Sequence, residues 1–183
     1  MGCLSSCFKR CSRINFPQVY VLQLENNKYY VGESNNIDKR IKSHKKGNGS
    51  AWTRKYPVIR GEKPFTEPQK HLWELTETLE RIKLHGIENV RGSMFTSPYP
   101  LKSHEKIMAA QLYCELKGLC RKCGSSGHFI THCNSDKLED WVHNFGGELQ
   151  FNSDKNRYCI RCSKNINETP GYFRYCSECY LRV

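Results

Sequence analysis

Cysteine is distributed very unevenly along the chain, and this limits how the chain can fold. Three of the eleven cysteines lie in the first eleven residues, one is Cys114, and seven lie between Cys120 and Cys179, so residues 12–113 have none. A disulfide framework of a secreted domain would not leave such a gap, and no secretory signal with a long apolar segment opens the chain. We therefore expect an intracellular protein in a reducing compartment, the cytoplasm or the nucleus, whose clustered cysteines bind metal.

The first of the two C-terminal cysteine clusters is the segment CRKCGSSGHFITHC. Its Cys-x2-Cys-x4-His-x4-Cys spacing resembles the zinc knuckle of nucleocapsid-type proteins, and the ligands would be Cys120, Cys123, His128 and Cys133. Four such ligands in a short loop can surround Zn²⁺ as a tetrahedron, and Gly124 and Gly127 would let the backbone wrap around the ion. A chance spacing of unpaired thiols is the weaker interpretation. Knuckles bind exposed bases, and Phe129 is available for stacking.

The second cluster has two Cys-x2-Cys pairs with thirteen residues between them, and its cysteines are Cys159, Cys162, Cys176 and Cys179. Each pair can supply two thiolates from one tight turn, which suits a Cys₄ structural zinc site in a ribbon-like module. Few aliphatic residues are present, so metal would provide much of the folding energy. The aromatic and arginine side chains here could contact nucleic acid, but most of the aromatic ones are expected to form the small core. Together the clusters predict two Zn²⁺ ions.

The sequence between the first cysteines and the clusters is typical of a mixed α/β domain. The runs VYVLQL and YYVG predict two strands, and the segment ENNK between them predicts a hairpin turn. A helix is expected from about Ile37 to Lys46, with Ser34, Asn35 or Asn36 as its N-cap and KGNGS as its stop. A loop with three prolines follows, and these are Pro57, Pro64 and Pro68.

A second helix is expected to begin near Pro68 and to end before Gly86, because proline suits a first turn and glycine suits a C-terminal stop. Its apolar residues recur at helical spacing, and they are Leu72, Leu75, Leu79 and Ile82. From residue 114 the sequence becomes cysteine-rich and polar. We therefore predict a basic leader over residues 1–16, an α/β domain over 17–113, a zinc knuckle over 114–140 and a Cys₄ module over 141–183.

The chain is strongly basic, with 29 Lys and Arg against 18 Asp and Glu and a net charge of +11. Eight of these basic residues lie between Lys39 and Arg60, where no acidic residue occurs. Such clustering favours a surface that faces phosphates over charge that merely keeps the protein soluble. No apolar run approaches the roughly 20 residues of a membrane span, so a spanning helix is not expected.

The helix expected after the hairpin carries two polar residues that could face the sheet. Arg40 and His44 are four residues apart, and they would share one face with Ile37 and Ile41. That face could lean toward the hairpin tyrosines, Tyr20 and Tyr30. On spacing alone, solvated side chains are the simpler interpretation.

The order of these segments resembles the GIY-YIG nuclease family. The segments VYV, YYVG and KRIKSH match its two strand motifs and the helix that bears an essential arginine, although QVY replaces GIY. The segment WELTETLERIKLHGIENVRGSMF matches the helix with a metal-binding glutamate followed fifteen residues later by an asparagine, which here are Glu74 and Asn89. NVRGS is also close to NVRGG, a segment of a subset that often carries zinc knuckles. The resemblance covers residues 17 to about 100 and implies a small sheet flanked by helices.

The resemblance also implies a chemistry, which is hydrolysis of nucleic-acid phosphodiester bonds with one divalent metal, Mg²⁺ or Mn²⁺. Glu74 would hold the metal, and Glu67 and Glu77 are neighbouring alternatives. Arg40 would clamp the scissile phosphate. The phenol of Tyr20 would act as general base or position the water, and Tyr30 and His44 would assist. Asn89 would fix local geometry.

We therefore predict an endonuclease whose zinc modules bind nucleic acid, with DNA favoured over RNA and no small-molecule cofactor. A non-catalytic nucleic-acid-binding protein on a decayed nuclease scaffold is the alternative, although retention of the whole residue set argues against decay. At the N-terminus, Gly2 with Ser6 fits an N-myristoylation pattern and Cys3 could accept a second acyl chain, so contact with a membrane and a disordered basic leader both remain open. By family association, the pairing of nuclease and knuckle also hints at a protein encoded by a large DNA virus or a mobile element.

Overall fold

The computed structural model describes residues 17–62, 73–150, 162 and 178. The chain divides into two compact units, Met1–Leu149 and Gln150–Val183. In the second unit Cys162 lies exposed in a turn, whereas the rest of the predicted Cys₄ cluster lies outside the described residues. Gly2 and Cys3 also lie outside them. No helix in the part of the chain that is described is long and apolar enough to cross a membrane.

The first unit begins with the predicted hairpin, which the structure confirms. Strands β1 (Gln18–Leu24) and β2 (Lys28–Ser34) pair in antiparallel fashion through a 3-10 turn, η2 (Glu25–Asn27). Asn26 and Asn27 have φ of 56° and 54°, a left-handed conformation that asparagine tolerates better than most residues. The turn chemistry therefore fixes the register that places Tyr20 opposite Gly32.

Two further strands complete a sheet of order β3-β1-β2-β4. Strand β3 (Val58–Glu62) pairs antiparallel with β1, and β4 (Val90–Arg91) pairs parallel with β2. The prediction that this proline-rich stretch is only a loop was wrong for β3. Pro57 directly precedes β3 and so removes no ladder hydrogen bond, and the strand is a largely exposed edge without the apolar alternation that marks a half-buried strand.

The first predicted helix is confirmed as α1 (Ile37–Lys45), and Asn36 is its cap because its Oδ1 accepts a hydrogen bond of 2.9 Å from the Lys39 N–H. A short helix that was not predicted follows, α2 (Ala51–Lys55), capped by Ser50. The segment KGNGS therefore stops one helix and starts the next. Five residues are too few to show a helical period.

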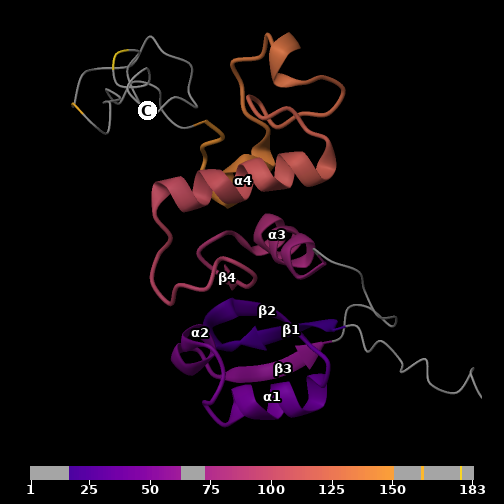
Figure 1. Cartoon of the computed structure of the whole chain (residues 1–183), viewed down its shortest axis with the longest axis vertical. Coiled ribbons are helices and arrows are strands. Elements are labelled where there is room, and N and C mark those ends of the chain that lie inside the picture. Colours follow the sequence, from indigo (N-terminus) through magenta and orange to yellow (C-terminus); the bar gives the residue numbers. More distant parts are fainter. Residues whose placement is uncertain (1–16, 63–72, 151–161, 163–177, 179–183) are drawn as a thin grey trace, which may run out of the picture. The chain divides into compact units, whose positions relative to one another are not determined.

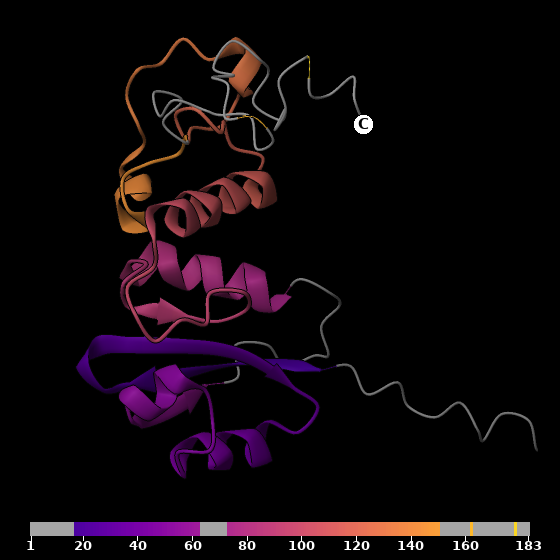
Figure 2. The same cartoon turned by 60° about the vertical axis from the view of Figure 1, so that its left-hand side comes forward.

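The sheet lies between two sets of helices (Figures 1 and 2). Helices α1 and α2 cover one face, where Tyr20, Leu22 and Trp52 are buried together. Helix α3 (Trp73–His85) covers the opposite face, contacts β2, and ends before Gly86 as predicted, whereas the expected start near Pro68 lies outside the described residues. Strand alternation sends Val31 of β2 to that second face.

Helix α4 (Ser103–Lys117) packs on the far side of α3 and was not predicted. Two further 3-10 segments follow it, η3 (Ile130–His132) and η4 (Asp140–Phe145). Helix α4 continues through the predicted domain boundary at residue 114, and η4 contacts both α3 and α4. Fully buried Val142 and Phe145 join Leu79 and Ile82 in one core. Segments assigned to three predicted domains thus share a single hydrophobic core.

Candidate active site and metal centre

The two hairpin tyrosines meet on the face of the sheet that α1 covers. The ring centroids of Tyr20 and Tyr30 are 6.4 Å apart. A Cβ atom on Gly32, which lies opposite Tyr20 in the hairpin, would sit 2.5 Å from the Tyr20 hydroxyl oxygen and 3.0 Å from the Tyr30 ring. The glycine of the YYVG segment is therefore required sterically, because any larger residue would occupy the space of the phenol.

His44 joins this pair from helix α1. Its Nε2 lies 2.9 Å from the Tyr20 hydroxyl oxygen, its ring centroid lies 5.1 Å from that of Tyr30, and only 2% of the residue is exposed. Burial, together with the nearby positive charge of Arg40, lowers the pKa of His44 from 6.5 to about 4. The imidazole is therefore neutral at neutral pH.

Arg40 lies one helical turn before His44 and is half-buried. Its guanidinium lies close enough to Tyr20 and Tyr30 to interact with both phenols. Burial raises the pKa of Tyr20 to about 12, while the interaction with Arg40 opposes that rise. Burial likewise raises the pKa of Tyr30. Both phenols are therefore protonated at neutral pH, and each can act as a base only by giving its own proton to another group.

Glu74 enters from the other side of the sheet, on the first turn of α3. Its Oε1 accepts a hydrogen bond of 2.9 Å from the backbone N–H of Ser93, which has φ of 49°. Burial raises the pKa of Glu74, the Ser93 N–H lowers it, and the charge of Glu33 raises it further. The Glu74 carboxylate also contributes to the raised pKa values of both hairpin tyrosines, so it shares their electrostatic environment.

Of the two alternatives to Glu74, only Glu77 is described. Its Oε1 accepts a hydrogen bond of 2.7 Å from Arg81 Nε in an ion pair along α3. Glu74, by contrast, is among the groups that raise the pKa of both hairpin tyrosines. Glu67 lies outside the described residues. Glu77 is thus engaged with Arg81, whereas Glu74 shares the electrostatic environment of Tyr20 and Tyr30.

Asn89 makes its contacts elsewhere. Its Nδ2 donates to the His85 carbonyl at 2.6 Å, and its Oδ1 accepts from Lys28 Nζ at 2.7 Å. Its backbone carbonyl accepts from the Tyr29 N–H at 2.8 Å. These bonds tie the end of α3 to the start of β2, so the contacts of Asn89 are structural and involve none of the four residues gathered around Tyr20.

Arg91 was given no role in the sequence analysis, although it stands in the NVRGS segment. It is 1% exposed, and its guanidinium lies 4.4 Å from the centroid of the Trp52 ring. Its donors bond to four backbone carbonyls at 2.6–2.9 Å, those of Ile87, Val90, Ser97 and Tyr99. Arg91 therefore fixes the loop after β4, which carries the Ser93 N–H that orients Glu74.

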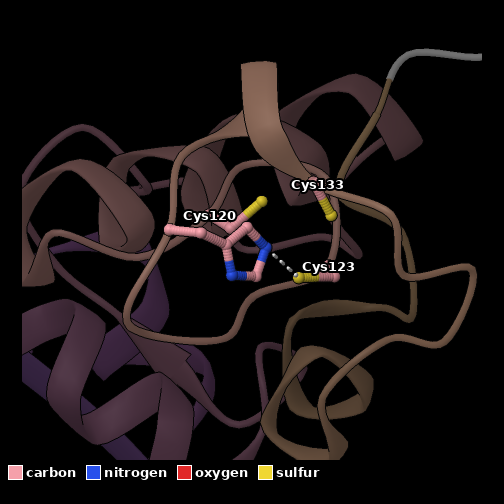
Figure 3. A group of neighbouring side chains, drawn as sticks. Cys120, Cys123 and Cys133 are labelled. Atoms are coloured by element: carbon pink, nitrogen blue, oxygen red, sulfur yellow. Dashed lines mark hydrogen bonds between the residues drawn. The ribbon is translucent and has the colours of Figure 1, made fainter.

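The first cysteine cluster forms a compact group of potential ligands. The ligand atoms of Cys120, Cys123, His128 and Cys133 all lie within 4.8 Å of one another. In Figure 3 the sulfur atoms of the three labelled cysteines lie around one region, and the dashed line marks the 3.4 Å contact between Cys123 Sγ and His128 Nε2. Tetrahedral Zn²⁺, with bonds of about 2.0–2.3 Å, needs ligand atoms about 3.3–3.8 Å apart, so the group could hold this ion after a contraction of up to about 1 Å.

The ligand loop is attached to the core of the first unit. Trp141 Nε1 donates to the Gly124 carbonyl at 3.1 Å, and the Glu139 N–H donates to the Cys123 carbonyl at 2.9 Å. The Trp141 ring packs on Tyr113 of α4 and Phe145 of η4. Movement of the ligand loop would therefore disturb the packing of α4.

The fold and the residues around Tyr20 define a nuclease-like α/β scaffold, and a comparison with family models gives the same class. The model of the GIY-YIG catalytic domain matches residues 16–86, so this segment is a GIY-YIG domain, from a family of endonucleases that use divalent metals. No curated protein matches the chain. No solved structure matches it either. Asn89 and Arg91 lie beyond the match.

Proposed function

We propose that this chain is a metal-dependent endonuclease that hydrolyses phosphodiester bonds in nucleic acids, with DNA favoured over RNA, inside the cell. The convergence of Tyr20, Arg40 and His44 on one side of the sheet is the observation that carries the proposal, and Glu74 acts on the pKa of both hairpin tyrosines.

The proton path follows from the contacts around Tyr20. As a water oxygen bonds to phosphorus, the water gives a proton to the Tyr20 oxygen, and Tyr20 gives its own proton to His44 Nε2, which is 2.9 Å away. The bond from phosphorus to the leaving oxygen breaks, and that oxygen takes a proton from solvent. Arg40, which lies near the Tyr20 phenol, can direct an N–H donor at a phosphate oxygen and so stabilise the developing charge.

Glu74 suits a hard divalent cation such as Mg²⁺ or Mn²⁺. One carboxylate oxygen is held by the Ser93 N–H, which leaves the other for an ion that completes its shell with water and phosphate oxygens. When bound, the ion would withdraw charge from the scissile phosphate. The fit of a hard cation rests on this oxygen donor, since the cysteine ligands belong to the separate cluster.

We propose that the Cys120–Cys133 cluster holds a structural Zn²⁺ and that Cys159, Cys162, Cys176 and Cys179 hold a second. All four positions of the first tetrahedron would be filled by protein ligands, which leaves no open position for catalysis. Both modules would add nucleic-acid contacts to those of the basic surface of α1 and α2. On that surface Lys39, Lys42 and Lys45 are exposed, and each phosphate contact would add to the salt dependence of binding.

A nicking assay with Mg²⁺ or Mn²⁺, run beside a gel-shift assay on the same substrates, tests this function. Glu74→Ala should abolish cleavage and leave binding intact or stronger, because it removes a metal ligand and one negative charge. Glu77→Ala is the matched control, since it removes a carboxylate from the same helix and should retain cleavage. Loss of cleavage in Glu77→Ala alone would move the metal site, and binding without cleavage by the wild type on plasmid, single-stranded DNA and structured RNA would favour the non-catalytic alternative.

A further inference from the structure

Both ring nitrogens of His44 have buried partners. Nε2 faces the Tyr20 hydroxyl at 2.9 Å, and Nδ1 faces Thr53 Oγ1 at 2.8 Å. His44 and Thr53 are each 2% exposed. A neutral imidazole carries a proton on only one nitrogen, so these two contacts together define which nitrogen that is.

The hydrogen bonds of Thr53 give the direction. Its single hydroxyl proton is donated to the Ser50 carbonyl at 3.1 Å, so toward His44 the Thr53 oxygen can only accept. Nδ1 of His44 must then carry the ring proton. Nε2 is left with a free electron pair, which accepts the hydroxyl proton of Tyr20.

We propose that Thr53 is a positioning residue that holds His44 as its Nδ1–H tautomer, so that Nε2 is ready to receive the proton of Tyr20. The tautomer is a property of the folded chain, whereas its catalytic consequence rests on the proposed nuclease function. Thr53 was not singled out from the sequence, because its role depends on a cap residue and a helix too short to predict.

The surroundings of the ring favour this tautomer. The titratable groups that face His44 are Tyr20 on β1, Tyr30 on β2 and Arg40 on α1. Among the described residues, the partner that the structure gives the Tyr20 hydroxyl is His44 Nε2, so the phenol proton has this nitrogen as its acceptor. The opposite tautomer would make Thr53 donate to Nδ1 and abandon its bond to the Ser50 carbonyl.

The backbone before Thr53 is shaped around the same contact. A Cβ atom on Gly49 would lie 2.1 Å from His44 Nδ1 and 2.7 Å from Thr53 Oγ1. Ser50 caps α2, because its side-chain Oγ accepts a hydrogen bond from the Thr53 N–H. This cap sets the position of Thr53 on the first turn. The local backbone therefore presents one acceptor, Thr53 Oγ1, to the imidazole, and this arrangement depends on Gly49 and Ser50.

Nitrogen-15 NMR of the imidazole groups in the full zinc-loaded chain tests the tautomer directly. The His44 signals are identified by their absence from a His44→Gln spectrum. Wild type and Thr53→Ser should show one Nδ1–H tautomer, and Thr53→Val, which keeps the shape but removes the hydroxyl, should shift the population toward Nε2–H. A wild-type spectrum of the Nε2–H form overturns the proposal without any variant having to fold, as does an unchanged tautomer in folded Thr53→Val.

Cleavage kinetics test the consequence. Thr53→Val should lower kcat by about tenfold or more and change its pH profile, while gel-shift affinity stays unchanged and Thr53→Ser restores most of the rate. A shifted tautomer with unchanged kcat and pH profile would refute the positioning role. If the wild type cuts no substrate, the nuclease function and the catalytic meaning of Thr53 both fail, and the NMR result still decides the tautomer.

Discussion

Substitution of Arg91 measures how much a buried charge that is held by backbone carbonyls contributes to the stability of the fold. Its guanidinium is held by four backbone carbonyls and the Trp52 ring, and burial lowers its pKa. Replacement by Met fills similar volume but leaves the four acceptors without this donor. We therefore expect Arg91→Met to destabilise the chain although it introduces an apolar side chain into an apolar site.

The magnitude follows from the number of acceptors. A buried acceptor left unsatisfied costs about 1–3 kcal/mol, and relaxation satisfies about half of the four, which gives a loss of about 2–6 kcal/mol. Removal of the guanidinium also removes its own desolvation cost, which offsets part of this loss. We expect a net decrease of about 2 kcal/mol in the free energy of unfolding.

Equilibrium unfolding in urea of the zinc-loaded chain measures this decrease. Arg91→Lys is the matched variant, because it keeps the charge but not the planar fork that reaches several carbonyls at once, so it should recover only part of the stability. Both variants should also lower cleavage, since the loop that carries Ser93 loses its anchor. An Arg91→Met variant within about 1 kcal/mol of the wild type would refute this account of the buried network.

Three further predictions concern the same unit. Gly32→Ala should destabilise it by about 1–3 kcal/mol and reduce cleavage, because the new methyl overlaps the Tyr20 hydroxyl, and urea unfolding with the nicking assay checks both. The stability that His44 contributes should be complete above pH 6.5 and should be lost as the pH falls from 6.5 to about 4, by up to about 3 kcal/mol. The reason is that the imidazole of the unfolded chain takes up a proton at a higher pH than that of the folded chain. The difference in unfolding free energy between wild type and His44→Gln should therefore change between these pH values and stay constant above pH 6.5. Phe145→Ala should cost about 3–5 kcal/mol, and a loss below about 1 kcal/mol would show that η4 is not part of the core.

The hairpin, α1 and α3 could be predicted because each has a strong local signal. The hairpin has a turn between two apolar runs, α1 has an asparagine cap, and α3 has a stripe of leucine and isoleucine. Helix α4 has no comparable stripe, because its buried face includes small residues such as Ala109 and Ala110 whereas the larger Met108 and Leu116 are exposed. The two-residue strand β4 is too short to show any period.

The site shows a similar division. Tyr20, Arg40, His44 and Glu74 could be found because an ordered set of motifs connects them. Thr53, Ser93 and Arg91 could not, because their roles depend on backbone groups that only the fold brings near. Ser93 acts through its N–H and would give no signal as a side chain, and Arg91 binds carbonyls instead of the carboxylates that an arginine in a sequence suggests.

The packing of η4 on α3 also bears on how the chain folds during synthesis. Every residue grouped around Tyr20 has been translated by the time Glu74 is added, yet the core that α3 joins is complete only when Phe145 and Leu149 have left the ribosome. The GIY-YIG segment therefore completes its packing only with the part of the chain that follows the first cysteine cluster. A nascent chain paused before η4 would leave part of the apolar surface around Leu79 and Ile82 open to chaperones.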